Sequence, residues 1–324
     1  MSKIRIGIIG SGGTGTRHAE RFSEMDAVEV VAIASRNRET GAALAEKHDV
    51  EFIPDWQSLV QRENIDGAVI CTHNDTHAEI ALAALRCDKH IFLEYPLARS
   101  IDAGEAVIEV AQSNQRVLRI NHSETVSNSH RAIKQKAQEL GDLLLTTFLR
   151  LTPGRGTRPE ILFNLPVSGP PAHFFVYHIY PIIDLFGGVR SVEGSAIYEG
   201  LTDQGNYNRF VNTVNVEFKN AGLGSWVWVG GVEIQESEQH ARYVLTGGTI
   251  SDSGGKWHCS TGAGVEEIPP VDSPSVSLQE RWIQEIQTQD TSAAHRDAAT
   301  ALEAIRVSLS AEQSMQEKRR IVLE

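Results

Sequence analysis

The sequence predicts an α/β protein in which an N-terminal doubly wound Rossmann domain precedes an α+β domain with a large, mainly antiparallel sheet. In the first 121 residues, short β-branched runs alternate with amphipathic segments, a pattern typical of a parallel sheet covered by helices. Beyond residue 121, longer runs alternate apolar and polar residues without helices between them, which indicates antiparallel pairing. We therefore expect two domains, residues 1–121 and 122–324.

Composition narrows the class of protein. The 324 residues are 41% hydrophobic and 22% charged, enough for two domains that each bury a core. The formal net charge of -12 argues against affinity for nucleic acids or anionic membranes, so a small-molecule partner is expected. Three cysteines without CxxC spacing suggest neither a disulfide framework nor a thiolate metal site. A strand begins directly after the N-terminal residues and leaves no room for a signal peptide, which predicts a cytoplasmic protein.

The first domain is expected to contain six strands joined by crossover helices. Its predicted strands are Ile4–Ile9, Val28–Ala34, Glu51–Ile53, Gly67–Thr72, Ile91–Leu93 and Val117–Ile120. Its clearest predicted helices are Thr40–Lys47, His77–Arg86 and Asp102–Ser113.

The second domain is expected to begin with a helix and a strand, continue through a Pro/Gly-rich loop into long strands, and end in helices. The predicted strands are Leu143–Leu151, Ser191–Glu199, Phe210–Phe218, Gly224–Gly230 and Ala241–Thr246. The predicted helices are Ser129–Leu140, Ser277–Gln287 and Ala293–Gln316.

A phosphate-binding loop follows the first strand. The motif GxGxxG directly follows the apolar run Ile4–Ile9 and opens a helix, so glycine allows a tight turn and the helix N-terminus offers free amides to a pyrophosphate. The alternative is a Gly-rich turn without a ligand. The predicted cofactor-binding residues of this loop are Gly10, Ser11, Gly12, Gly13, Thr14 and Gly15.

The end of the second strand favours NADP(H) over NAD(H). An acidic residue there would bind the ribose hydroxyls of NAD, whereas a 2′-phosphate needs a cation. The chain has Ser35, Arg36 and Arg38 and no acid. The arginine fork suits a phosphate. The alternative is that both arginines are solvated residues at a helix start.

Two further segments carry a resemblance to a known family. The sequences ICTHNDTHAEIALAAL (70–85) and KHIFLEYPL (89–97) resemble those of the glucose-fructose oxidoreductase/inositol dehydrogenase family, Gfo/Idh/MocA. The resemblance continues through the C-terminal sheet. It implies a cis peptide bond before Pro96 and a cofactor whose ribose and nicotinamide are lined by Thr72, Asn74, His77 and Glu94. His73 and His77 have the spacing of a metal pair, but no third ligand accompanies them, so no metal is expected.

The chain departs from the family at its catalytic positions. Tyr95 replaces the lysine of the family's Glu-Lys-Pro segment, and the family's Asp-x-x-x-His-x-x-Asp helix corresponds here to His173, Tyr177 and Tyr180. Their spacing predicts one helical face. Alcohol oxidation requires a base with a pKa near working pH, and tyrosine starts from a pKa of about 10. Ordinary sugar dehydrogenation is therefore disfavoured.

Reduction of a conjugated substrate by hydride requires only a proton donor and no base. The Glu-Tyr-Pro variant resembles the bacterial biliverdin reductases of the family, as do Asn121-His122-Ser123-Glu124 and the runs 184–187 and 207–210. This resemblance implies reduction of a linear tetrapyrrole such as biliverdin by NADPH. The open alternatives are a sugar or cyclitol dehydrogenase with relocated acid/base residues and a non-catalytic NAD(P)-binding sensor.

The candidate residues divide into proton donors and substrate contacts. The catalytic candidates are Tyr95, Tyr177 and His178; for Tyr95 and for His178 the alternative is a purely structural role. Arginines on or beside the Pro/Gly-rich loop would pair with the propionates of the substrate. The alternative is that these arginines are solvated surface residues. The substrate-binding candidates are His122, Glu124, His173, Tyr180, Arg155 and Arg158, with Arg150 beside them.

Trp226, Val227 and Trp228 alternate along a predicted strand. This pattern indicates a sheet face packed against a partner subunit more than a substrate box. It predicts a homo-oligomer built through the C-terminal sheet.

Overall fold

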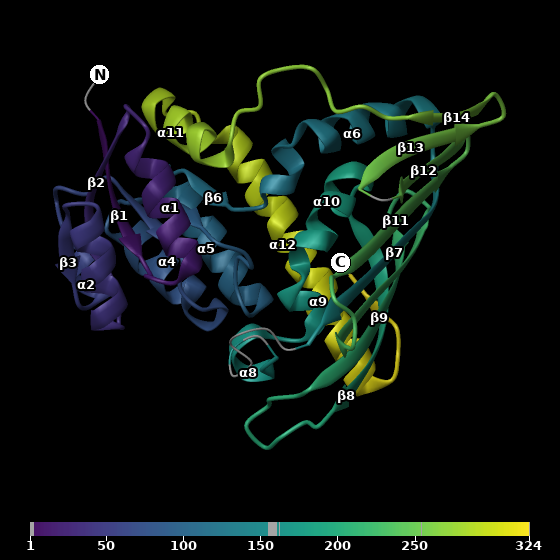
Figure 1. Cartoon of the computed structure of the whole chain (residues 1–324), viewed down its shortest axis with the longest axis horizontal. Helices are drawn as coiled ribbons and strands as arrows, with labels where there is room; N and C mark the ends of the chain where they lie inside the picture. The colour runs from purple at the N-terminus through teal and green to yellow at the C-terminus, as the bar shows by residue number, and fades with distance from the viewer. Residues whose placement is uncertain (1–2, 155–160, 162, 254, 324) are drawn as a thin grey trace. The chain divides into compact units, whose positions relative to one another are not determined.

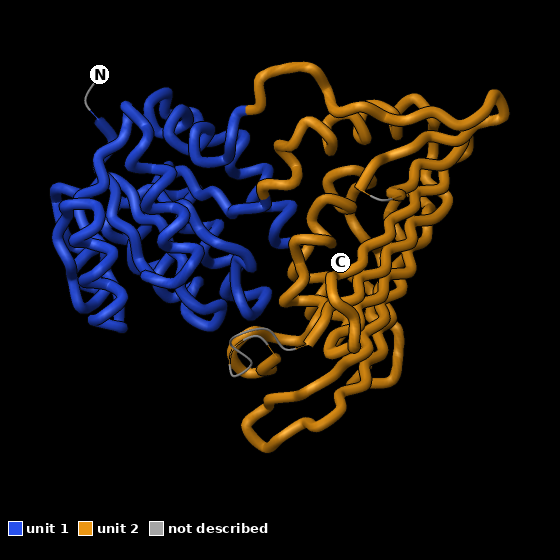
Figure 2. The backbone as a smooth tube through the Cα atoms, in the orientation of Figure 1, with its two compact units in different colours: residues 1–122, 276–302 blue, residues 123–275, 303–324 orange. Residues whose placement is uncertain are grey.

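The computed structural model describes residues 3–154, 161, 163–253 and 255–323, which divide into two compact units (Figure 2). The first unit contains residues 1–122 and 276–302, and the second contains residues 123–275 and 303–324. The first stretch of the first unit ends at His122, and the second unit begins at Ser123. Residues 276–302, however, pack with the first unit although the sequence prediction assigned them to the second domain.

The first unit contains a six-stranded parallel sheet in the order β3-β2-β1-β4-β5-β6 (Figure 1). This order is that of a doubly wound Rossmann sheet, which confirms the predicted fold class. The strands are β1 (Ile4–Ile9), β2 (Val28–Ala34), β3 (Glu51–Ile53), β4 (Gly67–Ile70), β5 (His90–Leu93) and β6 (Leu118–Ile120). The helical elements are α1 (Gly13–Ser23), α2 (Arg38–Lys47), α3 (Trp56–Val60), η1 (Asn74–Thr76), α4 (His77–Arg86), α5 (Ile101–Ser113), α11 (Leu278–Thr288) and the first part of α12 (Ser292–Glu317).

The helix α11 joins the first unit through an aromatic cluster. The ring of Trp282 is fully buried and lies 5.7 Å, between centroids, from both Phe22 of α1 and Phe92 of β5. Gly67 has no side chain in the way of this indole, since a Cβ there would lie 2.7 Å from it. The helix begins at a Ser277/Glu280 capping box. Tertiary packing of a distant segment, which local sequence patterns do not encode, therefore completes the core of this unit.

The second unit contains a nine-stranded sheet in the order β14-β13-β12-β11-β7-β10-β9-β8-β15. Among the described strands of this sheet, β7 and β10 alone pair in parallel, so the sheet is mainly antiparallel, as predicted. The strands β12–β14 and β15 were not predicted, because they are short and largely polar or exposed. The strands are β7 (Leu143–Pro153), β8 (Val189–Glu199), β9 (Arg209–Phe218), β10 (Leu223–Val232), β11 (Glu238–Leu245), β12 (Gly248–Ser253), β13 (Lys256–Thr261), β14 (Gly264–Glu267) and β15 (Ile321–Val322). The helical elements are η2 (Ser123–Val126), α6 (Asn128–Leu140), α8 (Leu165–Ser168), α9 (Pro171–Phe174), α10 (Val176–Phe186) and the second part of α12.

The tryptophan face of β10 belongs to the core of the second unit. Trp226 and Trp228 are 0% and 1% exposed. Their indole nitrogens donate hydrogen bonds to Thr146 Oγ1 at 2.9 Å and to His178 Nδ1 at 3.1 Å. The two indoles are therefore covered by residues of this chain, including His178 of α10, and the expectation that a face of this sheet packs against a partner subunit stays a prediction.

The predicted single helix through His173, Tyr177 and Tyr180 is interrupted. Phe175 leaves the helical region with φ −92° and ψ 25°, so His173 lies in α9 and both tyrosines lie in α10. The Phe175 ring stacks on His178 at 5.7 Å and tilts against Phe210 at 6.2 Å. Burial of this aromatic side chain overrides the continuous helical spacing, so the prediction of one helical face was wrong.

Candidate active site

The loop between β1 and α1 has room for a phosphate group. Gly10 has φ +112°, and a Cβ at Gly15 would lie 2.0 Å from the Gly10 carbonyl oxygen, so both positions require glycine. At Gly12 and Gly13, a Cβ would meet nothing within 4 Å. Gly12 caps α1 without a side-chain hydrogen bond, which leaves the first amides of this helix for a ligand. The loop therefore fits a pyrophosphate.

Three hydroxyl groups meet where the adenosine end of a dinucleotide would lie. Ser11 Oγ is 2.7 Å from Ser35 Oγ and 2.6 Å from Thr40 Oγ1. The exposed Arg36 and Arg38 follow at the start of α2, and neither forms a hydrogen bond or ion pair with a described residue. The site thus places two available cations beside polar hydroxyls. Thr40 was missed in the sequence, where only its position in the first turn of a predicted helix could have indicated it.

Glu94 directly follows β5 and is held by two donors. Its Oε1 lies 2.7 Å from His18 Nε2 and 2.7 Å from Asn121 Nδ2. His18 comes from α1 and is 5% exposed. Sequence analysis did not include His18; its place three residues after Gly15, on the helix that the glycine loop opens, was the available signal. The carboxylate therefore connects the phosphate-binding helix with the carboxyl ends of β5 and β6.

His77 connects the loops that follow β4 and β5. Its ring is fully buried, with Nδ1 2.8 Å from the Pro96 carbonyl oxygen and Nε2 3.2 Å from the Thr72 carbonyl oxygen. Burial lowers its pKa. Thr76 Oγ1 donates to Thr72 Oγ1 at 2.8 Å, and Asn74 lies between them in η1. Both ring nitrogens of His77 thus face backbone oxygens, so the ring orders the cofactor-side loops.

Tyr95 stands beside a neutral histidine. The Tyr95–Pro96 peptide bond is cis, as the family resemblance implied. The half-buried Tyr95 ring stacks on His122 with centroids 5.7 Å apart and planes 19° apart. Burial lowers the pKa of His122 to about 3, so its imidazole is neutral at neutral pH. His122, expected to open the second domain, belongs to the first unit.

The second unit places Tyr177, His178 and Arg150 together. The Tyr177 and His178 ring centroids are 4.1 Å apart, and the pKa of His178 is lowered to about 3, first by burial and then by the Arg150 charge. Burial raises the pKa of Tyr177, while Arg150 lowers it. Because His178 Nδ1 accepts from Trp228, the proton of this neutral imidazole is on Nε2. His178 can donate a hydrogen bond but has no free lone pair with which to act as a base.

The other substrate candidates differ in exposure. His173 is fully buried with Nδ1 3.0 Å from Ser308 Oγ, and Tyr180 is 3% exposed, so both have the surroundings of core residues. Glu124 is exposed in η2. Arg155 and Arg158 lie outside the described residues.

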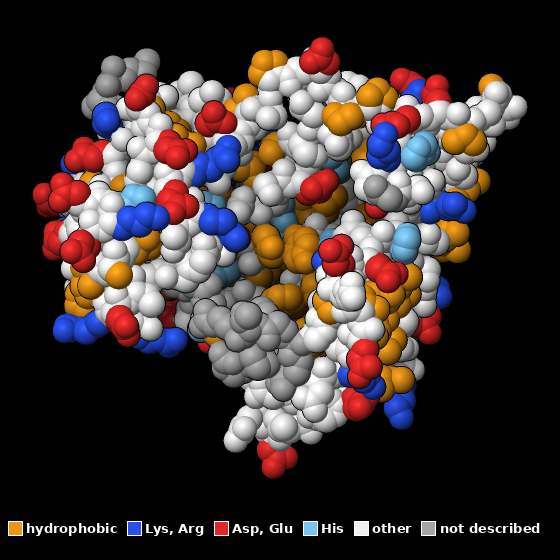
Figure 3. Space-filling view, in the orientation of Figure 1, with side chains coloured by type: hydrophobic (Ala, Val, Ile, Leu, Met, Phe, Trp, Pro, Cys, Tyr) orange, Lys and Arg blue, Asp and Glu red, His pale blue; other side chains and the backbone are white. Residues whose placement is uncertain are grey.

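The described ranges lack both metal-binding clusters and membrane-spanning helices. They contain no group of three or more His, Cys, Asp or Glu side chains that could hold a metal ion. No helix in the described part of the chain is both long and apolar enough to span a membrane. On the face in view in Figure 3, acidic and basic side chains are interspersed on each unit.

Comparison with known proteins identifies the first unit. Residues 4–122 match the model of the oxidoreductase family with an NAD-binding Rossmann fold, Gfo/Idh/MocA. The match over these residues confirms the resemblance found in the sequence. The chain is 33% identical over 194 residues to 4-carboxy-2-hydroxymuconate-6-semialdehyde dehydrogenase of Sphingobium sp., covering 56% of this chain and 58% of the relative. It is 29% identical over 167 residues to myo-inositol 2-dehydrogenase of Thermotoga maritima, covering 51% and 49%. The chain thus spans about half the length of these curated relatives.

Solved structures share the fold over the whole chain. Biliverdin reductase from Synechocystis sp. PCC 6803, in complex with biliverdin and NADP+, superposes with a TM-score of 0.83 at 23% identity, covering 97% of this chain and 99% of that one. Levoglucosan dehydrogenase in complex with NADH and levoglucosan gives a TM-score of 0.80 at 18% identity, with 100% of both chains covered. At these sequence identities the similarity shows a shared fold and nothing more.

Proposed function

We propose that the protein is an NAD(P)-dependent oxidoreductase that delivers hydride to a conjugated substrate, such as biliverdin or a related linear tetrapyrrole. The observation that carries the proposal is the absence of a usable base among the candidate catalytic residues. Tyr95 replaces the family's lysine, and burial lowers the pKa of His122 beside it to about 3, which makes that imidazole a weak base. The Nδ1 lone pair of His178 already accepts a hydrogen bond from Trp228. Alcohol oxidation needs a base, whereas reduction needs an acid.

The reduction requires one hydride and one proton. Held by the glycine loop, NADPH would supply the hydride to an electrophilic carbon of the conjugated system, leaving NADP+, and a proton would neutralise the charge that develops on the substrate. We assign proton donation to Tyr95, with Tyr177 as the second candidate. His178 is a poorer donor, because a neutral imidazole holds its remaining proton tightly. Its position favours hydrogen bonding to the substrate instead.

Arg150 supports an anionic substrate. Its guanidinium is half-buried beside Tyr177 and His178, and it forms no ion pair or hydrogen bond with the described residues. A partly buried cation without a carboxylate partner is stabilised when a ligand supplies one. The propionates of a linear tetrapyrrole fit this requirement, and Arg155 and Arg158 remain candidates for the same role. Four further residues are proposed to lie on the substrate side: His122, Glu124, His173 and Tyr180. Because His173 and Tyr180 are buried, a supporting role is favoured for these two.

The proposed cofactor is NADPH. Arg36 and Arg38 are exposed at the start of α2, with no acidic residue at the end of β2 to compete for the ribose. The solved biliverdin reductase of similar fold contains NADP+. The remaining cofactor contacts are proposed to come from the glycine loop, Ser35, Thr72, Asn74 and Glu94, with His77 holding the loops.

One assay tests the reaction. Purified protein is mixed with NADPH and biliverdin, and the absorption spectrum is followed together with the NADPH band. We expect the red biliverdin band to decay while a band grows at blue wavelengths, with NADPH consumed in equal amount. Reduction of NADP+ by a panel of polyols, without change of biliverdin, would instead support a dehydrogenase. Cofactor binding without turnover in either assay would support a sensor.

We propose that the protein forms a homo-oligomer through the outer face of the nine-stranded sheet. This face is opposite to the buried tryptophans and carries partly exposed apolar side chains on paired strands, with Val227 opposite Leu149 and Val229 opposite Leu151. Ile197 of β8 is 70% exposed beside Val211. A monomeric mass in light scattering at micromolar concentration would refute the oligomer. We also propose a cytoplasmic location, with which three free cysteines are consistent.

A further inference from the structure

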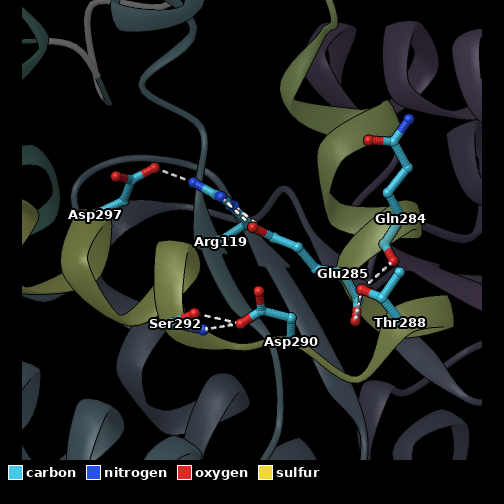
Figure 4. A network of polar contacts seen from close by, with 7 residues as sticks. All are labelled: Arg119, Gln284, Glu285, Thr288, Asp290, Ser292 and Asp297. Atoms are coloured by element: carbon cyan, nitrogen blue, oxygen red, sulfur yellow. Dashed lines mark hydrogen bonds and ion pairs between the residues drawn. The ribbon is translucent and has the colours of Figure 1, made fainter.

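The helix α11 presents one face to the first unit. Gln279, Trp282 and Glu285 are spaced i, i+3 and i+6, which places them on the same side of the helix. Trp282 fills the aromatic cluster described above. Glu285 pairs with Arg119 of β6, whose guanidinium is 1% exposed, through Nε–Oε2 at 2.8 Å and a second contact between Nη2 and Oε1 (Figure 4). Asp297 of α12 contacts the same guanidinium. Two contacts of this face, those of Gln279 and of Glu285, lead to the proposed cofactor site.

The first contact runs through His18 to Glu94. Gln279 Nε2 lies 3.3 Å from His18 Nδ1, and His18 Nε2 lies 2.7 Å from Glu94 Oε1. An amide nitrogen only donates hydrogen bonds, so Nδ1 accepts and the imidazole proton is on Nε2, directed at the carboxylate. Gln279 thereby selects the tautomer in which His18 donates to Glu94.

The second contact runs through β6. Arg119 precedes Asn121 by two residues, and Asn121 Nδ2 donates to the same Glu94 oxygen at 2.7 Å. The Glu285–Arg119 pair therefore fixes the strand end that supplies the second donor. Both hydrogen bonds to Oε1 depend on α11, while the second oxygen, Oε2, forms no hydrogen bond to any residue that the structure describes.

Glu94 lies on the nicotinamide side of a dinucleotide site. A dinucleotide crosses a doubly wound sheet at its switch point, with adenosine at the carboxyl end of β2 and nicotinamide toward β4 and β5. We propose that Gln279, acting with His18, is a positioning residue that aims the free Glu94 oxygen at the nicotinamide half of the cofactor. This rests on the nucleotide binding in the proposed function and does not depend on the substrate.

The test compares the binding of the complete cofactor with the binding of a fragment that lacks the nicotinamide. Gln279→Met keeps the length of the side chain but removes its donor, and Gln284→Met makes the same change on the exposed face of α11. Binding of NADPH and of 2′-phospho-ADP-ribose, which lacks nicotinamide, is measured by titration, with NADH and ADP-ribose in parallel. We expect Q279M to raise the Kd of NADPH about tenfold and to leave that of the fragment unchanged. Q284M should change neither.

Three results would overturn the proposal. An unchanged NADPH affinity in Q279M would remove the role of Gln279, and equal weakening of cofactor and fragment would show a general structural defect. Wild-type protein that binds no nucleotide would refute this proposal and the proposed function together. Failure of biliverdin reduction with normal nucleotide binding would refute the proposed substrate alone.

Variants of His18 provide an independent check. His18→Phe keeps the ring packing against Phe22 and Phe92 but removes both hydrogen bonds, while His18→Gln restores an amide donor. We expect NADPH affinity to fall in H18F and to recover in part in H18Q, at unchanged fragment affinity. H18Q no better than H18F would contradict the assignment of His18 as the donor to Glu94.

Discussion

Tyr95 is the residue at which the proposed chemistry departs most from the family pattern. Its ring is half-buried and stacked on neutral His122, so the pair offers one phenolic proton and no competing cation. The residues of the glycine loop, by contrast, follow the expected pattern. The sequence could therefore predict the cofactor side from motif spacing, whereas the roles of His178 and His173 depended on burial and on hydrogen-bond partners from distant elements.

We predict that Tyr95→Phe lowers kcat for biliverdin reduction about 100-fold, because it removes the general acid while keeping the stack on His122. The KM for NADPH should not change. Steady-state kinetics measures both constants. Tyr177→Phe is the matched variant, and we expect it to change kcat by less than about threefold. A larger loss of kcat in Y177F than in Y95F would show that Tyr177, and not Tyr95, donates the proton.

Arg36 should discriminate between the two cofactors. Arg36→Ala removes a cation placed to meet a 2′-phosphate, so we expect the Kd of NADPH to rise about tenfold and that of NADH to stay within about twofold. Fluorescence titration of both nucleotides gives the ratio. Arg86→Ala, which changes another exposed arginine of the first unit, is the control. An equal loss of affinity for both nucleotides in R36A would refute the assignment of NADPH as the cofactor.

At the scale of elements, the sequence predicts the strands of the first unit almost to the residue. Buried parallel strands are continuous apolar runs and crossover helices are amphipathic, so both carry strong local signals. The break between α9 and α10 and the packing of α11 with the first unit depend instead on aromatic contacts between residues distant in sequence, such as Phe175 with Phe210. Local periodicity does not encode those contacts.

The contribution of α11 can be measured through Trp282. Because this fully buried indole contacts Phe22 and Phe92, Trp282→Ala should lower the free energy of unfolding by about 3–5 kcal/mol, while Trp282→Phe should lose much less. Urea unfolding followed by circular dichroism gives both values. Gln284→Ala on the exposed face of the same helix should leave stability within about 0.5 kcal/mol. A loss below about 1 kcal/mol in W282A would show that α11 is not part of the core of the first unit.

At the scale of the whole chain, the expected fold class is confirmed and the expected division is changed. The Rossmann sheet is followed by a mainly antiparallel sheet, but residues 276–302 pack with the first unit. The long helix α12 has residues in both units. A boundary prediction based on composition treats domains as contiguous and cannot detect a returning segment. The physical signal lies in paired groups such as Arg119 and Glu285, which become recognisable only once they meet.

Among the residues that the structure describes, four histidines have a lowered pKa and therefore tend to gain a proton when the chain unfolds: His77, His90, His122 and His178. Burial lowers the pKa of His90 to about 4 and those of His122 and His178 to about 3, with nearby arginines adding to the shift of His90 and His178. Since the folded pKa values lie below the unfolded value of about 6.5, the unfolded chain binds more protons between these limits. Stability is therefore greatest above pH 6.5 and falls as the pH is lowered toward 4.

We predict that lowering the pH from 7 to 5 reduces the free energy of unfolding by at most about 2 kcal/mol for each of these histidines, from 1.5 pH units at about 1.36 kcal/mol per unit. Urea unfolding at both pH values measures the loss. His90→Gln isolates one contribution, because an amide oxygen can still accept the Val117 amide hydrogen bond while the titrating group is gone. This variant should lose less stability than wild type between pH 7 and 5. An identical loss in both proteins would show that His90 takes up no proton on unfolding.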